Sequence, residues 1–132
     1  MNPVRSSVGN TMLGRILTLL DRELNTVMTR EQHNTDRVHL YDAGDYWVSF
    51  EKSAYLLSRM ISSGEKPLVL YLKSYPFPIV MCTVRHSQLR IVCRQHVVAQ
   101  RGLEYLQLLT RPSDVSSYRK WHREYVRVQD KL

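Results

Sequence analysis

Four side chains in the second half of the chain have the types that bind zinc: Cys82, His86, Cys93 and His96. Two cysteines and two histidines form a common structural zinc site. From residue 88 to 97, however, apolar and polar residues alternate, which predicts a strand on which Cys93 and His96 point to opposite faces. We therefore favour reduced thiols packed in the core at both cysteines, and keep zinc as the less favoured alternative.

Three carboxylates are close in sequence, at Asp42, Asp45 and Glu51, but no Lys or His follows at a spacing typical of an acid–base pair. Asp45 suits a turn, and Glu51 suits the start of a helix. The stretch "SSGEKP" contains Gly and Lys but lacks the spacing of a phosphate-binding loop. We expect no catalytic residues, no metal and no cofactor.

The positive charge is concentrated at the C-terminal end of the chain. The net charge is +7; residues 1 to 84 carry nine Lys or Arg against eight Asp or Glu, and residues 85 to 132 carry ten against four. Such a basic region attracts polyanions such as nucleic acid, although it is also compatible with a solvated face or an acidic protein partner. The candidate phosphate contacts are Arg85, Arg90, Arg94, Arg119, Lys120, Arg123 and Arg127.

A chain of 132 residues with 43% hydrophobic residues is the size of one domain. We expect a flexible N-terminus over residues 1–10 and a single domain over residues 11–132. No apolar run approaches the length of a membrane-spanning helix, and the N-terminus lacks the apolar stretch of a secretory signal. The sequence therefore predicts a soluble, cytoplasmic protein.

Hydrophobic periodicity predicts the elements of the first two thirds of the chain. An amphipathic helix begins after Asn10 or Thr11, either of which can serve as N-cap, and continues to about residue 31. The remaining elements are two strands at about 38–42 and 46–50, joined by Ala43, Gly44 and Asp45; a helix at 51–62 closed by Gly64; and strands within 67–75 and 78–84.

The last third gives less uniform patterns. Alternation predicts the strand at 88–97, with Arg90 and Arg94 on its outer face. Residues 98–109 are compatible with helix or strand, and we favour helix. A terminal helix follows Ser113 or Asp114. Its apolar stripe is Val115, Tyr118, Trp121 or His122, Tyr125 and Val128, and its basic residues cover the other side.

The stretch "YDAGDYWVSF" places aromatic residues directly after a glycine turn. In the strand after Gly44, Tyr46 and Phe50 share one face with Val48, whereas Trp47 lies on the other. One of the rings must therefore lie outside the core.

Two motifs resemble the mismatch-recognition domain of MutS DNA mismatch-repair proteins. "GDYWVSFEKSA" is similar to the family's G-D-F-Y-E-L-F signature and the small Ala that follows it, and "PIVMCTVR" is similar to its P-I-P-M-A-G-V-P. The resemblance covers residues from about 12 to 84. It implies an α/β domain in which a mixed β-sheet of four to six strands is flanked by three or four helices.

In that family the Phe of the signature wedges into the duplex, and the Glu two residues later bonds the mispaired base. Tyr46 stands at the wedge position, and its ring can stack. Val48 stands at the Glu position and cannot form a hydrogen bond through its side chain. The chain also lacks the clamp and ATPase regions.

These observations lead to a stand-alone, non-catalytic module that binds DNA or structured nucleic acid. Its candidate contacts are Tyr46, Trp47 and the basic residues named above, with Gly44 and Asp45 shaping the turn. The alternative is a protein-interaction or homodimerisation module that keeps the fold, in which Tyr46, Trp47 and Val48 form an exposed apolar patch.

Overall fold

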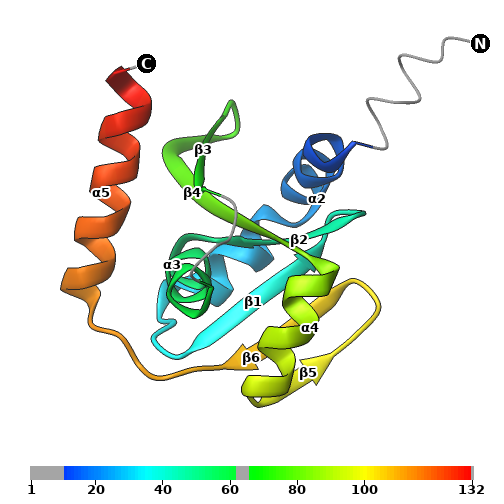
Figure 1. The fold of residues 1–132 in the computed structure, drawn as a ribbon. Coiled ribbons are helices and arrows are strands. Elements are labelled where there is room, and N and C mark those ends of the chain that lie inside the picture. The colour runs from blue at the N-terminus through cyan, green and yellow to red at the C-terminus, as the bar shows by residue number, and fades with distance from the viewer. Residues whose placement is uncertain (1–10, 62–65, 132) are drawn as a thin grey trace, which may run out of the picture.

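Six strands in the described part of the chain form one sheet in the order β3-β4-β2-β1-β6-β5 (Figure 1). The computed structural model describes residues 11–61 and 66–131. The predicted flexibility of residues 1–10 and the predicted cap at Gly64 lie outside this range. The strands are β1 (Arg37–Asp42), β2 (Tyr46–Phe50), β3 (Leu68–Leu72), β4 (Tyr75–Arg85), β5 (Val98–Arg101) and β6 (Tyr105–Leu109).

The sheet is antiparallel throughout its described pairings, so the prediction of a mixed sheet was wrong. Three of the five pairs, β1–β2, β3–β4 and β5–β6, are hairpins joined by short turns, which can only produce antiparallel neighbours. The other two pairs, β2–β4 and β1–β6, bring these hairpins together. The general prediction of a single α/β domain is confirmed.

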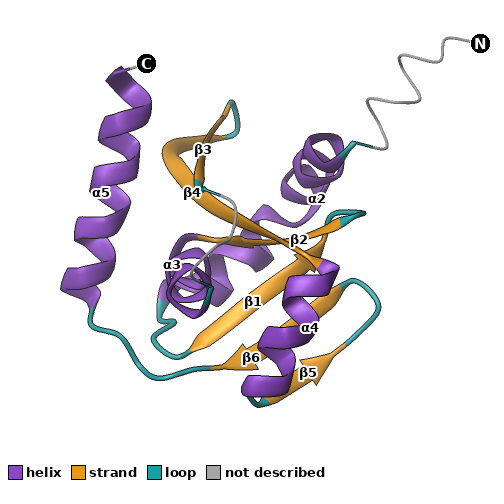
Figure 2. Ribbon diagram, in the orientation of Figure 1, coloured by secondary structure: helices purple, strands orange, loops and turns teal. Residues whose placement is uncertain are grey.

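Four helices are described: α2 (Met12–Gln32), α3 (Glu51–Met60), α4 (His86–Gln95) and α5 (Val115–Lys131). Helix α2 packs on one face of the sheet, and α3 and α4 pack on the other (Figure 2). Helix α5 lies beside α3 and the β3–β4 hairpin. No helix in the described ranges is long and apolar enough to cross a membrane.

The core has two parts because side chains of the central strands alternate between the two faces. On the α2 side, Val48 and Phe50 are fully buried beside Ile16 and Leu20. On the α3 and α4 side, Val84 packs with Val38 and Leu40 of β1 and with Leu106 and Leu108 of β6 against both helices. Val48 and Phe50 lie in one part of the core, and Trp47 packs against the other part. This confirms the predicted alternation along β2, in which Tyr46, Val48 and Phe50 share one face and Trp47 lies on the other.

Residues 88–97 do not form the predicted strand, because helix α4 occupies this stretch. Leu89 and Val92 are buried three residues apart, whereas Ile91 is 55% exposed. That spacing matches one face of a helix, and it covers Leu106 and Leu108 of the sheet. The short alternation of apolar and polar residues was therefore coincidental.

Residues 98–109 form strands β5 and β6, so the helix favoured from sequence was also wrong. Leu106 and Leu108 are buried, two residues apart, and β6 pairs with β1 at Leu40. Gly102 lies in the connecting turn, where its N–H donates to the carbonyl oxygen of Tyr105 at 2.8 Å. Tertiary pairing with β1 decides the conformation, since the segment alone is ambiguous.

The first and last helices begin as predicted. The hydroxyl of Thr11 accepts from Gly14 N–H at 3.0 Å, and the carboxylate of Asp114 accepts from Ser117 N–H at 2.7 Å. In the terminal helix the predicted apolar stripe is only partly covered. Its central residues are half-buried, whereas Val115 and Val128 are 42% and 58% exposed.

The turn between β1 and β2 requires a glycine. Gly44 has φ +90°, and its N–H donates to the side chain of Asp42 at 2.9 Å. A Cβ at this position would also lie 3.2 Å from the side chain of Arg15. We expect Gly44→Ala to lower the free energy of unfolding by about 1–3 kcal/mol, measured by urea denaturation. Asp45→Ala, at the exposed neighbouring position, is the control; an equal loss there would contradict this assignment of strain.

Candidate nucleic-acid interface

The two rings that follow the turn lie on opposite faces of β2, and both are half-buried. Tyr46 pairs across the sheet with Arg85, the last residue of β4, and the Arg85 guanidinium lies 5.8 Å from the centre of the Tyr46 ring. A cation beside an aromatic face is attracted to it. The predicted wedge residue is therefore at the end of the sheet, next to one of the predicted phosphate contacts.

Trp47 is held by a chain of hydrogen bonds to the start of α4. Its indole N–H donates to Nδ1 of His86 at 3.1 Å, and Nε2 of His86 lies 2.9 Å from the carbonyl oxygen of Gly44. An indole nitrogen can only donate, so Nδ1 accepts and Nε2 carries the proton that reaches the carbonyl. This contact fixes the indole relative to the Gly44 turn.

A cavity of about 560 Å³ opens between Trp47, α4 and the β5–β6 hairpin. We call it the α4 pocket. Leu89 and Leu106 form the apolar wall of the pocket. The full set of lining residues is Trp47, His86, Leu89, Arg90, Cys93, Arg94, Arg101, Gly102 and Leu106. None of these lining residues is an Asp or Glu, so its polar part is predominantly cationic.

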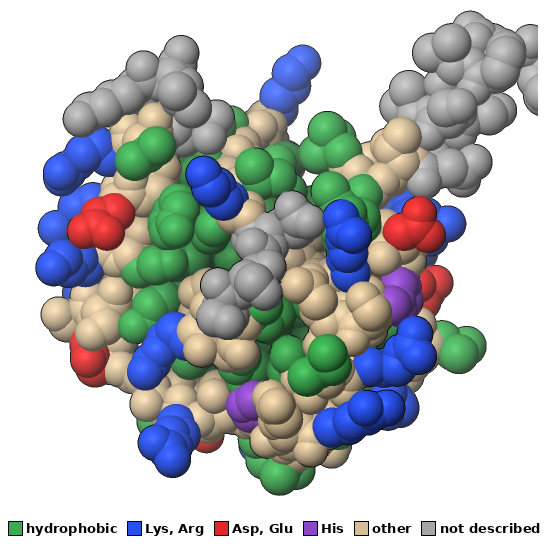
Figure 3. All heavy atoms as spheres, in the orientation of Figure 1, with side chains coloured by type: hydrophobic (Ala, Val, Ile, Leu, Met, Phe, Trp, Pro, Cys, Tyr) green, Lys and Arg blue, Asp and Glu red, His purple; other side chains and the backbone are tan. Residues whose placement is uncertain are grey.

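The structure thus places the predicted contacts at one end of β2 and β4, with Tyr46 and Arg85 on one face of the sheet and Trp47, Arg90 and Arg94 on the other, where Arg101 and His86 join them. We call these seven residues the α4 surface. All four arginines are exposed, and Figure 3 shows Lys and Arg side chains gathered over α4 and β5 at the lower right of the molecule. Sequence analysis did not single out Arg101, because only the pairing of β5 with β6 places it beside α4.

The basic residues of the terminal helix form a separate group. Arg119, Lys120, Arg123 and Arg127 are exposed on α5. Figure 3 shows Lys and Arg side chains along the left edge of the molecule, the side on which α5 lies in Figure 1. Arg119 and Arg123 line a second cavity, of about 420 Å³, together with Phe77 near the start of β4. Phe77 and Arg85 are eight residues apart on β4, which corresponds to roughly 25 Å. The predicted contacts therefore do not form one continuous basic face.

Glu51 connects α3, α5 and β4. One carboxylate oxygen accepts from Val80 N–H at 3.0 Å; the other accepts from the Tyr118 hydroxyl and lies 2.9 Å from Nε2 of His122. The His122 contact has an ion-pair distance without hydrogen-bond alignment. Burial, followed by the nearby Glu51 carboxylate, raises the pKa of Tyr118. The predicted helix-start residue is also a tertiary anchor.

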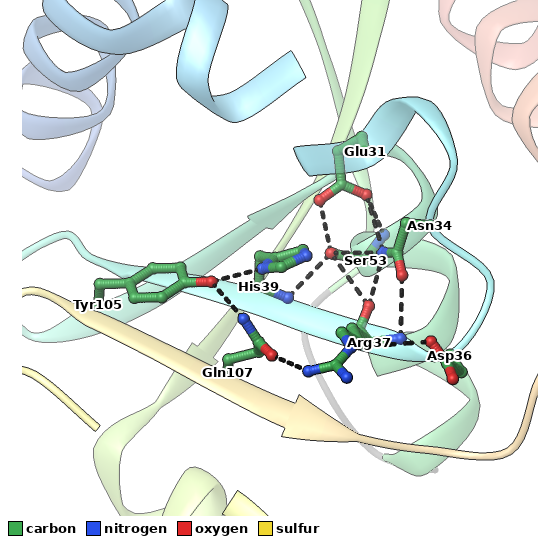
Figure 4. Close-up of polar contacts among 8 residues, drawn as sticks. All are labelled: Glu31, Asn34, Asp36, Arg37, His39, Ser53, Tyr105 and Gln107. Atoms are coloured by element: carbon green, nitrogen blue, oxygen red, sulfur yellow. Dashed lines mark hydrogen bonds and ion pairs between the residues drawn. The ribbon is translucent and has the colours of Figure 1, made fainter. Parts of the chain in front are cut away.

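A buried polar network that the sequence did not indicate connects α2, α3 and β1 (Figure 4). Glu31 is 4% exposed and accepts from the backbone N–H of Ser53 at 2.8 Å and from its hydroxyl at 2.6 Å. Burial is the main cause that raises the pKa of Glu31, to about 7. The only sequence signal was a charged residue close to an apolar helical face.

His39 lies in the adjoining part of the same network. Its Nδ1 lies 2.6 Å from the Tyr105 hydroxyl, and its backbone N–H donates to Ser53 Oγ at 2.9 Å. Burial, followed by the charges of Arg30 and Arg37, lowers the pKa of His39 to about 4. The imidazole is therefore neutral near pH 7.

The zinc-type residues have other surroundings. Cys82 is buried in β4, where burial raises the pKa of its thiol to about 12, and Cys93 lines the α4 pocket. His86 contacts Trp47, and Nδ1 of His96 lies 3.0 Å from the carbonyl oxygen of Val92. The described residues contain no group of three or more His, Cys, Asp or Glu that could hold a metal ion.

Comparison with protein-family models, with curated proteins and with solved structures gives no significant match for this chain. The likeness to the MutS mismatch-recognition domain therefore depends on the two motifs at Gly44–Ala54 and Pro78–Arg85. The functional argument depends on the α4 surface itself.

Proposed function

We propose that this protein is a non-catalytic module that binds DNA or structured nucleic acid through the α4 surface. The observation that carries the proposal is that two half-buried rings lie at one end of the sheet beside exposed arginines: Tyr46 with Arg85 on one face, and Trp47 with Arg90, Arg94 and Arg101 on the other. Guanidinium groups bind phosphates, and aromatic rings add stacking with bases.

The order of elements is compatible with the proposal. In the MutS family that the chain resembles, a helix follows the second motif; here α4 begins at His86, directly after that motif. Tyr46 is the candidate stacking residue, as the resemblance implies. Val48 is fully buried and offers no polar group, so we expect binding without recognition of a mispaired base.

Fluorescence anisotropy with a labelled DNA duplex tests the proposal. We expect Arg90→Ala combined with Arg94→Ala to weaken binding by about tenfold or more at low salt, because two phosphate contacts are lost. The slope of log affinity against log salt should become less steep by about 2. Tyr46→Ala should weaken binding with little change in this slope, since stacking releases few counterions.

The matched comparison is Arg119→Ala combined with Arg123→Ala, which removes the same charge from α5. If the α5 double substitution weakened DNA binding more than the α4 double substitution, the binding site would lie on α5 rather than on the α4 surface, contrary to the proposal. Binding that is independent of salt, or that survives both double substitutions and Tyr46→Ala, would overturn the proposal.

Self-association is a second candidate, but through a different surface from the predicted one. Val48 is 0% exposed, so it cannot belong to the predicted apolar patch with Tyr46 and Trp47. The β3–β4 hairpin instead exposes Leu68, Tyr71 and Phe77, at 47%, 57% and 64%, and β3 is an edge strand. Exposed apolar side chains on an edge hairpin favour association.

Sedimentation velocity over a range of protein concentrations tests this second candidate. We expect Phe77→Ser to raise the dissociation constant of the dimer about tenfold, because the apolar contact of this exposed ring with the second copy would be lost. Leu103→Ser is the control, since Leu103 is 95% exposed in the β5–β6 turn, outside the hairpin. A wild-type protein that sediments as a monomer at all concentrations would eliminate this candidate.

A further inference from the structure

The α4 pocket combines an aromatic ring, an apolar wall and three guanidinium groups in one cavity. We propose that it binds one nucleoside phosphate unit, with the base against Trp47 and the apolar wall and the phosphate at Arg90, Arg94 and Arg101. The unit could be a free nucleotide or the unstacked terminal nucleotide of a strand. Binding of a free nucleotide does not depend on the proposed binding of DNA or structured nucleic acid, whereas binding of a strand end does.

The size and composition of the cavity fit a ligand of this class. About 560 Å³ is within the range of small-molecule sites, which are mostly apolar with a few converging polar groups. Leu89 and Leu106 are almost fully buried, at 5% and 2% exposure, so the wall belongs to the packed core rather than to a mobile surface. A planar base stacked on the half-buried Trp47 ring would exclude water from that ring.

The charges select a phosphate over a neutral or cationic group. Arg90 and Arg94 are four residues apart on α4 and therefore lie on the same side of the helix, and Arg101 faces them from the end of β5. No carboxylate lines the pocket to pair with these guanidiniums. Guanidinium groups bind phosphate oxygens through charge-assisted hydrogen bonds.

The ring that faces the base is held in position before a ligand binds. The hydrogen bond from Trp47 to His86, and the contact from His86 to Gly44, fix the indole at the edge of the cavity. A fixed ring loses little conformational entropy on binding, so stacking adds to affinity.

Cys93 provides a direct probe of occupancy, because this half-buried residue lines the pocket. The other cysteine, Cys82, is 4% exposed, and burial raises its pKa to about 12, so it should react slowly with thiol reagents. The rate at which iodoacetamide alkylates Cys93 therefore reports whether the pocket is filled. Mass spectrometry identifies the modified residue, and Cys93→Ser should abolish the signal.

The experiment measures this rate with adenosine 5′-monophosphate, adenosine, inorganic phosphate, a blunt duplex, and the same duplex with a phosphorylated single-nucleotide 5′ overhang. We expect the monophosphate to slow alkylation by about tenfold at saturation, with little effect of adenosine or phosphate alone, since base and phosphate bind together. Protection by the overhanging duplex alone would identify the strand end as the source.

Variants separate the pocket from the rest of the surface. Arg90→Ala combined with Arg94→Ala should raise the concentration of monophosphate needed for half protection by about tenfold or more. Arg119→Ala combined with Arg123→Ala, outside the pocket, should leave it unchanged within about twofold. Because these side chains are exposed, the variants are expected to fold, and circular dichroism checks this.

The proposal would be overturned if neither the monophosphate nor the overhanging duplex protected Cys93 from alkylation, or if inorganic phosphate protected it as well as the monophosphate did. It would also be overturned if the blunt and overhanging duplexes protected Cys93 equally while the monophosphate gave no protection. Anisotropy on the same samples keeps the two proposals distinct. Protection by the monophosphate with no DNA binding would remove the proposed function alone, and DNA binding with an unprotected Cys93 would remove the pocket alone.

Discussion

Replacing Glu51 with alanine is expected to lower the free energy of unfolding by about 3 kcal/mol or more. The substitution leaves Val80 N–H and the Tyr118 hydroxyl without their acceptor, in a region closed by α5. Each unpaired group costs about 1–3 kcal/mol. Urea denaturation followed by circular dichroism measures the loss.

Glu51→Gly gives a sharper test, because Glu51 has φ +54°. A left-handed conformation costs a residue with a Cβ about 1–2 kcal/mol, and glycine avoids this cost. We therefore expect Glu51→Gly to be more stable than Glu51→Ala by about 1 kcal/mol, although glycine is normally the poorer helix residue. The reverse order of the two variants would contradict a strained backbone at this position.

Lys52→Ala is the matched control for both substitutions. Lys52 lies next to Glu51 on the first turn of α3, and its Nζ donates to the carbonyl oxygen of Gln32 in an exposed contact. We expect a loss of less than about 0.5 kcal/mol. A loss comparable to that of Glu51→Ala would mean that the first turn of α3 is sensitive to any change, rather than to the carboxylate contacts.

The second large effect is a pair of opposite pH dependences within one buried network. Glu31 has its pKa raised from 4.5 to about 7, so the folded state holds this proton more tightly than the unfolded state. The energetic cost of burying its charge is absent below pH 4.5 and is complete above pH 7. The contribution of Glu31 to the free energy of unfolding therefore falls as pH rises from 4.5 to 7.

His39 acts in the opposite direction. Its pKa is lowered from 6.5 to about 4, so between these pH values the imidazole is protonated in the unfolded state and neutral in the folded state. Its cost is absent above pH 6.5 and grows as pH falls toward 4. In the wild-type protein the two contributions largely cancel between pH 5 and pH 7.5.

Single substitutions should reveal each contribution. Between pH 7.5 and pH 5.0 we expect Glu31→Gln to lose about 2 kcal/mol of stability, because only the contribution of His39 remains. We expect His39→Gln to gain about 2 kcal/mol over the same change, because only the contribution of Glu31 remains. Urea denaturation at the two pH values measures both.

The double variant Glu31→Gln with His39→Gln is the control, and its stability should again change little between these pH values. Parallel pH dependences in the two single variants would contradict the assignment of opposite shifts. So would a wild-type protein that loses as much stability on acidification as Glu31→Gln.

The sequence allowed the local geometry of the candidate site to be predicted where neighbouring residues define it. The aromatic pair Tyr46 and Trp47 follows from the turn at Gly44 and from the alternation of a strand. The arginines of α4 were named for their charge, although their stretch was assigned to a strand. The place of Arg101, the contact of His86 with Trp47, and the α4 pocket could not be predicted, because they depend on contacts between segments far apart in the sequence.

The sequence by itself determined the elements with strong local signals: the capped helices α2 and α5, the β1–β2 hairpin with its glycine, and helix α3. These depend on caps, turns and periodicity within a few residues. Tertiary structure decided between helix and strand for α4, β5 and β6, since short amphipathic segments fit either conformation until a partner covers them. It also placed the carboxylate of Glu31 against Ser53 and separated the α4 basic residues from those of α5, because both arrangements depend on how the elements pack.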